Sequence, residues 1–542
     1  MMSQAIMNAD VEVAPVSRPD MDGGNKPLHV VMFFTVLIGA LGFAAFSILH
    51  DMHAVGEGPL ATGTFVLLGV ALIIALAFEF VNGFHDTANA VATVIYTHSL
   101  PPLFAVIWSG FWNFLGVATS AGTVAYSIVT LLPVELILDA GNTAGYAMIF
   151  ALLLAAIIWN LATWAFGIPN SSSHALVGSI MGVGLANQFM APAGATTQGV
   201  NWEQVRKVFA SLLFSPVCGF VMAALLLLTL KLLVKNRALY DAPKGHEPPP
   251  WWIRGLLITT CTGVSFSHGG NDGQKGMGLI MLILIGAAPT AYALNRAMPE
   301  SAMPAFIQTA DQANHIFLDH AGAVPVAMDV ATAKTTVGAA LRAQSVASPE
   351  TFSALAVLSH DISDSVRTYG SMKSVPAAAV PNVRTEMYLS ADAIRVMGAA
   401  NGFSADEKKT LKSFQSDLYA GTRFIPLWVK VSVAIALGLG TMVGWKRIVI
   451  TVGEKIGKTH LTYAEGASAE VVAMSTIGLA EGYGLPVSTT HILSSGVAGA
   501  MEANGSGLQW STLRSMAMAW VTTLPAAMAI AGCLYVIFRQ VF

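Results

Sequence analysis

The chain of 542 residues is 54% hydrophobic and 11% charged, whereas an ordinary soluble domain has about 25% charged residues. Its formal net charge of −3 gives no basic surface of the kind that binds nucleic acid, and its mean hydropathy is +0.62. The three cysteines, Cys218, Cys261 and Cys533, lie in apolar segments without CxxC spacing, which argues against a disulfide framework or a zinc site.

The first 27 residues mix acidic side chains with proline and glycine. They lack the basic-then-apolar order of a secretion signal, so we expect a disordered N-terminal tail. Six later runs approach or exceed the roughly 18–20 apolar residues with which a helix crosses a bilayer. They cover residues 28–50, 60–81, 146–168, 208–230, 424–445 and 514–538. The sequence therefore predicts an all-α, multi-pass protein of the lipid bilayer.

Positive charge collects in two short loops, within residues 231–254 and 446–458. The positive-inside rule assigns such loops to the cytoplasm, so the polar stretch 290–423 is expected outside. That stretch carries helix-start signals and no catalytic motif, and we expect a small, mostly helical extramembrane insertion. The predicted order is a first membrane half (28–230), a cytoplasmic linker (231–252), the start of a second half (253–289), the insertion (290–423) and the remainder of the second half (424–542).

Two different motifs recur in the same order along the chain. The segment GFHDTANA at residues 83–90 aligns with GGNDGQKG at 269–276, and IPNSSSHALVGS from Ile168 aligns with LPVSTTHILSSG from Leu485. If each proline-hydroxyl stretch is the tip of a re-entrant hairpin, the two aspartate motifs run through the membrane in opposite directions. The sequence thus predicts two inverted repeats, an architecture typical of secondary transporters.

The aspartates of the first motif pair are Asp86 and Asp272. An aspartate in a membrane helix costs about 2.5 to 3.5 kcal/mol, so it needs a partner or a watery cavity. Asn89 stands three residues after Asp86, and Lys275 stands three residues after Asp272, so each pair shares one helix face. A polar clasp between helices is the alternative, but matching positions in two repeats favour a functional site.

Each hydroxyl triplet follows a proline and precedes an apolar helical segment, as an N-cap does. A helix that starts at membrane depth presents unpaired N–H groups and a positive dipole end to an anion. We therefore predict a donor-rich site for a tetrahedral oxyanion. Its expected substrate-binding residues are Ser171, Ser172, Ser173, Ser488, Thr489, Thr490, Asn89, Asn271 and Gln274.

Carboxylates beside an anion site imply that cations enter with the anion. A membrane potential of 100 mV, negative inside, opposes entry by about 2.3 kcal/mol per negative charge. Uphill uptake of a dianion therefore requires co-transported positive charge, either protons or sodium on the carboxylates or a divalent metal on the anion.

The sequence resembles the inorganic phosphate transporter (Pit) family, most closely its bacterial low-affinity members. GFHDTANAVATVIYT, FSHGGNDGQKGMGL, IIWNLATWAFGIPNSSSH and GLPVSTTHILSSGVAG carry the likeness, which extends over the membrane-spanning parts. The resemblance implies a homodimer in the bacterial inner membrane that imports phosphate by proton-coupled symport. It also implies that phosphate could travel as a neutral complex with Mg²⁺ or another divalent cation, with no bound cofactor.

His85 and Lys275 depart from the family's general motif, Gly-x-Asn-Asp-x-x-Asn-Ala, because each stands where that motif has asparagine. Lysine offers donors only, and imidazole prefers softer metals than sodium. We therefore expect these changes to disable sodium sites and leave proton coupling. The expected coupling-ion residues are Asp86, Asp272, His85 and Lys275, and no resident metal site is expected.

Several other functions fit the motifs less well. An intramembrane hydrolase would need one nucleophile, but the serines lie in duplicated runs without a Gly-x-Ser-x-Gly elbow, so we expect no enzyme. A passive pore would not explain inverted duplication. The nearer alternatives are a same-fold transporter of sulfate or another oxyanion, and sodium-coupled phosphate symport.

Overall fold

The computed structural model describes residues 27–541 apart from 57–59, 87, 133–142, 192–198, 244–246, 323–327 and 399–401, together with Pro19 and Met21. The predicted tail at residues 1–27 thus lies almost entirely outside the described residues. In the described part every named element is a helix, and a single antiparallel bridge joins Gly457 to Leu508. The predicted all-α class is confirmed.

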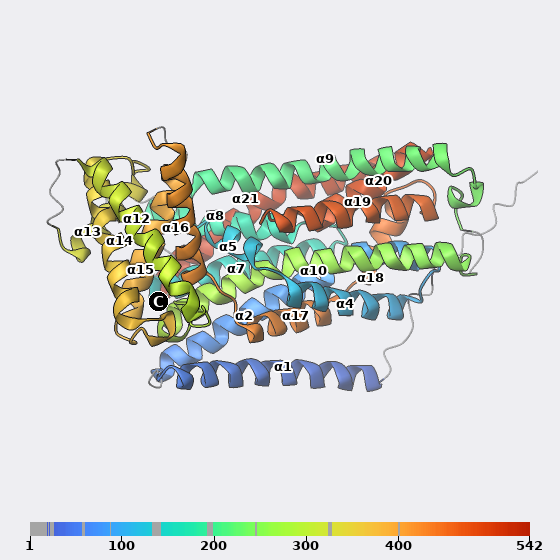
Figure 1. Ribbon diagram of the computed structural model, residues 1–542. Coiled ribbons are helices and arrows are strands. Elements are labelled where there is room, and N and C mark those ends of the chain that lie inside the picture. The colour runs from blue at the N-terminus through green and yellow to red at the C-terminus, as the bar shows by residue number, and fades with distance from the viewer. Residues whose placement is uncertain are drawn as a thin grey trace, which may run out of the picture.

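Six spans among the described residues are long and apolar enough to cross a membrane. They are α1 (Pro27–Ala54), α2 (Thr62–Asp86) continued by α3 (Ala88–Tyr96), α4 (Pro102–Thr119), α7 (Thr143–Ala165), α9 (Trp202–Leu233) and α21 (Trp510–Val541). Five of them contain or overlap the apolar runs that the sequence predicts. They form an elongated bundle of helices that run roughly parallel or antiparallel to one another (Figure 1).

The sixth predicted run, 424–445, is wrong as a single long span. Its helix, α17 (Leu427–Thr441), has 15 residues and is joined to α16 (Ala405–Thr422) at a bend of 74°. Pro426 lies directly before α17 and breaks the continuity, because proline cannot donate the backbone hydrogen bond of a continuing helix. Conversely, α4 was not predicted, since Ser109 and Asn113 interrupt its apolar character.

The long helix α10 (Trp251–Ala287) packs against α4 and α19 (Tyr463–Gly482). It continues through its aspartate motif, and the first motif lies within the span of α2 and α3, Thr62–Tyr96. Glycines let neighbouring helices approach α10 closely. A Cβ at Gly269 would lie 2.2 Å from the Asn113 carbonyl oxygen, and one at Gly276 would lie 2.3 Å from Glu79 Cγ.

Two shorter helices, α8 (Ser172–Met190) and α20 (Thr489–Asn504), begin near each other inside the bundle. From there α8 runs towards the α12–α16 end of the molecule and α20 runs away from it (Figure 1). Each packs against one long helix, α8 against α21 and α20 against α9. The smaller elements are α5 (Thr123–Val129), α11 (Pro289–Tyr292), α18 (Lys446–Ile450), η1 (Arg237–Leu239), η2 (Glu300–Ala302), η3 (Met372–Ser374) and η4 (Thr451–Lys455).

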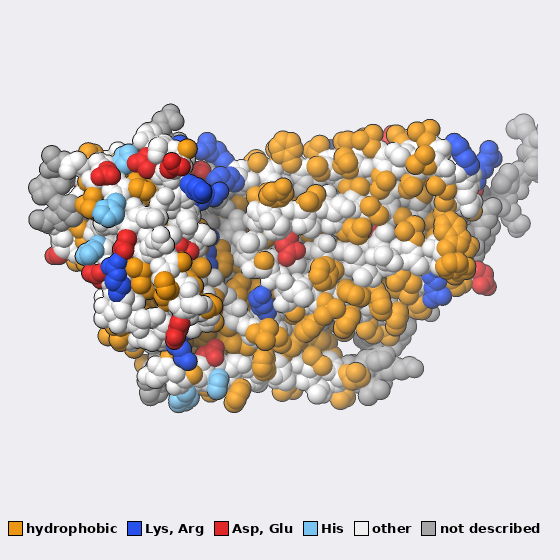
Figure 2. All heavy atoms as spheres, viewed as in Figure 1, with side chains coloured by type: hydrophobic (Ala, Val, Ile, Leu, Met, Phe, Trp, Pro, Cys, Tyr) orange, Lys and Arg blue, Asp and Glu red, His pale blue; other side chains and the backbone are white. Residues whose placement is uncertain are grey.

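The outer unit consists of α12 (Met303–Ala321), α13 (Val330–Arg342), α14 (Pro349–Tyr369), α15 (Val380–Met397) and α16. It has a hydrophobic core of its own, in which Phe306, Leu358, Met387 and Phe414 are buried. Charged side chains gather on this unit and at the opposite end of the molecule, while hydrophobic side chains cover much of the surface between (Figure 2). The outer unit lies within the stretch predicted to be extramembrane.

Candidate functional site

Asp86 lies where α8 and α20 begin, at the tips of the consecutive helix pairs α7–α8 and α19–α20, here called the first and second hairpins. It is the last residue of α2, and it is buried. Its Oδ2 accepts a hydrogen bond from Ser172 Oγ at 2.6 Å, and its Oδ1 accepts one from Thr490 Oγ1 at 2.7 Å. Since Ser172 belongs to α8 and Thr490 to α20, one carboxylate ties together hydroxyls from two segments that are more than 300 residues apart.

The hydroxyl triplets begin their helices as predicted. Ser171 is the N-cap of α8 and accepts a hydrogen bond from the His174 backbone N–H, while Ser488 is the N-cap of α20 and accepts one from the His491 N–H. An N-cap side chain satisfies one of the four N–H groups that a helix start leaves unpaired. The remaining N–H groups and the positive dipole ends give both helix starts affinity for negative charge.

Ser173 connects the first hairpin to the second and to α10. Its hydroxyl donates to the Val487 carbonyl oxygen at 2.7 Å and lies 2.5 Å from Lys275 Nζ, which donates to it. The same ammonium lies 2.8 Å from Asp272 Oδ2, and both side chains are fully buried. The second aspartate thus forms an ion pair within α10, with the ammonium reaching towards the hairpin tips.

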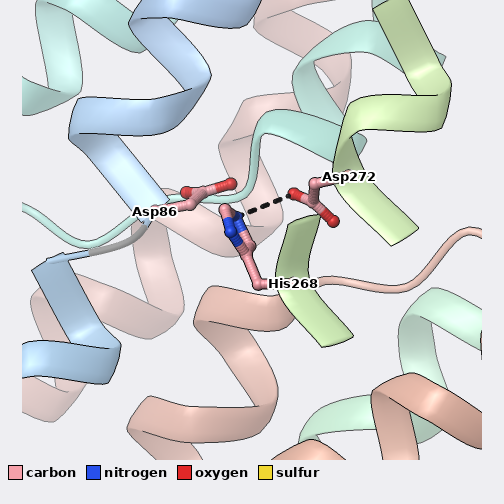
Figure 3. Close-up of side chains that lie close together, drawn as sticks. All are labelled: Asp86, His268 and Asp272. Carbon is pink, nitrogen blue, oxygen red and sulfur yellow. Dashed lines mark ion pairs between the residues drawn. The ribbon is translucent and has the colours of Figure 1, made fainter. Parts of the chain in front are cut away.

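Asp86, His268 and Asp272 form a compact buried cluster at the level of the hairpin tips. One ligand atom from each lies within 4.8 Å of the others, and the His268 Nε2 atom lies 3.5 Å from Asp272 Oδ2 (Figure 3). The side chains approach from the end of α2 and from α10. These atoms could ligate a cation, but Lys275 already places a positive charge on Asp272 and would compete with a metal ion there.

Two further predicted residues, His85 and Asn271, have described side chains near the hairpin tips. His85 is buried between Asp86, at 3.2 Å, and the Thr163 hydroxyl of α7, also at 3.2 Å. Asn271 donates to the Leu485 carbonyl oxygen at 3.1 Å and so holds the start of the second hairpin. The side chain of Asn89 lies outside the described residues.

Gln274 is directed away from the hairpin tips. Its Oε1 accepts a hydrogen bond from the Val124 N–H of α5 at 2.8 Å, and its Nε2 donates to the Gly270 carbonyl oxygen at 2.7 Å and to Glu481 at 3.2 Å. This arrangement fixes α5 against α10. Its expected role in substrate binding stays a prediction.

Asn113, Thr163 and Trp520 escaped the sequence analysis. Asn113 of α4 lies with its Oδ1 2.7 Å from His268 Nδ1, and Thr163 contacts His85. The rings of His174 and His491 are 4.7 Å apart, and Trp520 stacks on His491 at 4.1 Å. An amide in an apolar run was a usable signal for Asn113, whereas nothing local distinguishes Thr163 or Trp520.

Residues 82–531 match the model of the phosphate transporter family. The chain belongs to this family. It is 42% identical over 500 residues to the low-affinity inorganic phosphate transporter PitA of Escherichia coli strain K12. This match covers 89% of this chain and 98% of PitA. It is 40% identical over 498 residues to PitB of the same strain, covering 89% of this chain and 99% of that protein. The resemblance carried by the four quoted motifs is thereby confirmed.

A solved structure titled as the sodium-dependent phosphate transporter is also similar to this chain. It has a TM-score of 0.50 and 21% sequence identity, and the match covers 88% of this chain and 100% of that one. At this identity the likeness shows a shared fold. The coupling ion of this chain therefore has to be argued from its own residues.

Proposed function

We propose that this phosphate transporter family member imports inorganic phosphate by proton-coupled symport, with the anion bound between the starts of α8 and α20. The observation that carries the proposal is the pair of hydroxyls, Ser172 and Thr490, that converge on Asp86 from the two hairpins. The relatives named above are phosphate transporters of a bacterium, which favours phosphate as the substrate and the bacterial inner membrane as the location.

The hydroxyl bonds suggest how anion and cation binding are linked. A serine or threonine hydroxyl has one donor hydrogen, so Ser172 and Thr490 cannot donate to Asp86 and to phosphate at the same time. When both turn to the anion, the buried Asp86 carboxylate keeps His85 at 3.2 Å but loses two hydroxyl donors, and the loss of donors at a buried charge is costly. A proton on Asp86 removes that cost, so phosphate and proton favour each other's binding.

Lys275 supports protons over sodium as the coupling ion. Its ammonium occupies the space beside Asp272 in which a sodium ion would need oxygen ligands, and ammonium groups are donors only. Asp86 is then the carboxylate left to exchange a cation. Entry of a phosphate dianion against 100 mV costs about 4.6 kcal/mol, which bound protons or a neutral complex with Mg²⁺ would offset.

The two hairpins further support an inverted-repeat transporter with alternating access. In this arrangement the α2–α3 and α8 elements would be the counterparts of α10 and α20. We also propose a homodimer, in line with the family resemblance. Cross-linking in the native membrane tests that assembly separately from transport.

The decisive experiment is uptake of radiolabelled phosphate into proteoliposomes under an inward proton gradient, with and without Mg²⁺ and with sulfate as competitor. We expect accumulation that sulfate does not inhibit, and no accumulation on a sodium gradient at constant pH. Asp86→Asn keeps the shape and removes the titrating group, so it should abolish gradient-driven accumulation. Asp241→Asn, at an exposed loop position, is the control and should transport normally.

Three results would contradict parts of the proposal. Accumulation driven by sodium alone would mean sodium coupling. Equal inhibition by sulfate would mean an oxyanion carrier without phosphate specificity, because phosphate is then not recognised through a protonated oxygen. Normal accumulation by Asp86→Asn would remove Asp86 from the coupling step.

A further inference from the structure

A cationic pocket lies between the outer unit and the membrane bundle. It is lined by Arg384 and Tyr388 of α15, by Arg423 at the end of α16, by Tyr126 and Thr130 from α5 and the turn that follows it, and by residues of α10 from Gly278 to Ile285. Its volume is about 30 Å³, which is room for about two water molecules. The pocket therefore brings two guanidinium groups and two aromatic rings against the membrane helix that carries Asp272 and Lys275.

Arg384 has no anionic partner in the part of the chain that the structure describes. The residue is 9% exposed, and no carboxylate of the described residues lies within ion-pair distance of its guanidinium. The Tyr388 ring, whose centroid lies 5.8 Å from Arg384 Cζ, compensates the charge in part. A buried cation without a counter-ion is unfavourable, so a site that holds one is suited to receive an anion.

Arg423 is held in position by aromatic stacking. Its Cζ lies 3.3 Å from the Tyr419 ring centroid and 5.3 Å from that of Tyr126. The Tyr126 hydroxyl donates to the Phe424 carbonyl oxygen at 2.7 Å and ties this wall to the bend between α16 and α17. Arg384 and Arg423 thus line one pocket, and planar guanidinium groups are suited to the oxygens of a phosphate.

The pocket and the central site both lie along α10. Gly278 follows Lys275 by three residues and Ile285 by ten, and a helix rises 1.5 Å per residue. The pocket lining therefore extends from about 5 Å to about 15 Å beyond Lys275 along α10. The pocket is therefore between the outer unit and the level of the central site along this helix.

We infer that Arg384 and Arg423 form a vestibule site that binds a tetrahedral oxyanion, inorganic phosphate, before it enters the central site. This inference rests on the proposed function in naming phosphate. The vestibule compensates the repulsion that the buried carboxylates Asp86 and Asp272 exert on an approaching anion. Since the space has room for about two water molecules, the lining side chains must move apart to admit phosphate, which then contacts the guanidinium groups directly.

Equilibrium binding of radiolabelled phosphate to the full chain in lipid nanodiscs tests the inference. We expect two phosphates per chain in the unaltered protein and one in Arg384→Gln. Arg384→Lys, which keeps the charge without the planar fork, should retain the second site with weaker affinity. Lys412→Gln changes the net charge equally at an exposed position of the outer unit, and it should keep both sites.

Transport kinetics distinguish a phosphate-binding role of Arg384 and Arg423 from a purely structural one. Arg384→Gln and Arg423→Gln should each raise the KM for external phosphate on the order of tenfold with kcat nearly unchanged, and should reduce the dependence of KM on ionic strength. An unchanged stoichiometry and KM in a folded Arg384→Gln protein would overturn the vestibule, as would loss of the site in Lys412→Gln.

The same binding assay separates this inference from the proposed function. The double variant Ser172→Ala/Thr490→Val alters the central site alone and should lose the other phosphate. If this variant keeps all bound phosphate while Arg384→Gln loses one, the vestibule stands and the central phosphate site is wrong. If the double variant loses one phosphate and Arg384→Gln loses none, the vestibule is wrong and the central site stands.

Discussion

Lys275 and Asp272 pair inside the membrane with neither side chain exposed, at a distance of 2.8 Å. A buried pair of this kind contributes little net stability, because desolvation of both charges offsets their attraction. Loss of one partner, however, leaves an uncompensated charge in an apolar surrounding. A single substitution in this pair should therefore reduce stability more than the substitution of both residues.

We predict that Lys275→Met and Asp272→Asn each destabilise the protein by about 3–5 kcal/mol. The double variant should recover much of that loss, since it contains neither buried charge. The measurement is the thermal midpoint of the purified protein in one detergent, with Lys207→Met on the exposed part of α9 as the control. Additive losses in the double variant would show that the two charges do not compensate each other.

At this scale, residue type and spacing identified much of the candidate site. The aspartates, the hydroxyl triplets and Lys275 could be identified because charged and polar groups are energetically costly within apolar membrane segments. Thr163 and Asn113 were not, because their contacts with His85 and His268 span 78 and 155 residues of sequence. Those contacts depend on how α7 and α4 pack, which no local pattern encodes.

At the scale of helices, close packing depends on backbone contact at glycine. A Cβ at Gly182 of α8 would lie 2.1 Å from the Met528 carbonyl oxygen of α21. Gly182→Ala should therefore push the two helices apart and destabilise the protein by about 1–3 kcal/mol. Gly69→Ala on α2, where nothing lies within 4 Å, should be neutral or slightly stabilising. Equal thermal midpoints for both variants would contradict the packing argument.

Glu386 of α15 makes the helix packing of the outer unit sensitive to pH. Burial, reinforced by Asp361 and opposed by Lys334, raises the pKa of Glu386 from its ordinary 4.5 to about 8. In the folded unit the carboxyl keeps its proton up to that pH, whereas in the unfolded chain it ionises at its ordinary pKa. Unfolding thus releases a proton between these values, so the stability of the unit falls as pH rises through this window.

Hydrogen exchange of the α13–α15 amides checks this effect. We expect their opening free energy, corrected for intrinsic exchange, to decrease between about pH 5 and pH 8. Glu386→Gln should make the decrease smaller, while Glu300→Gln, at an exposed position, should not. The same pH slope in all three proteins would rule out Glu386 as the cause.

Helix existence was more predictable than helix continuity. Apolar length predicted five membrane helices, and proline followed by hydroxyls predicted the starts of α8 and α20. The apolar run 424–445 gave no sign that its helix is only 15 residues long and meets α16 at a bend of 74°. The close contacts of Asn113, Val117 and Glu79 with the glycines of α10 likewise depend on tertiary packing, which no local pattern encodes.

At the scale of the whole molecule, charged side chains are concentrated at the two ends of the long axis (Figure 2). The outer unit lies at one end, and the α9–α10 connection with Lys235 and Arg237 lies at the other (Figure 1). The positive-inside rule places the basic end in the cytoplasm. The outer unit and the proposed vestibule then face the side from which phosphate arrives, and the two ends should differ in their access to impermeant reagents.

Cysteine labelling in intact cells tests this orientation. Cys218, Cys261 and Cys533 are first replaced by serine, which leaves a background without thiols. We expect Lys409→Cys, on the exposed face of α16, to react with a membrane-impermeant maleimide before lysis. Arg237→Cys should react after lysis alone, because an intact membrane separates it from the reagent. The reverse pattern would mean the opposite orientation in the membrane, and Arg384 and Arg423 would then receive phosphate from the cytoplasm.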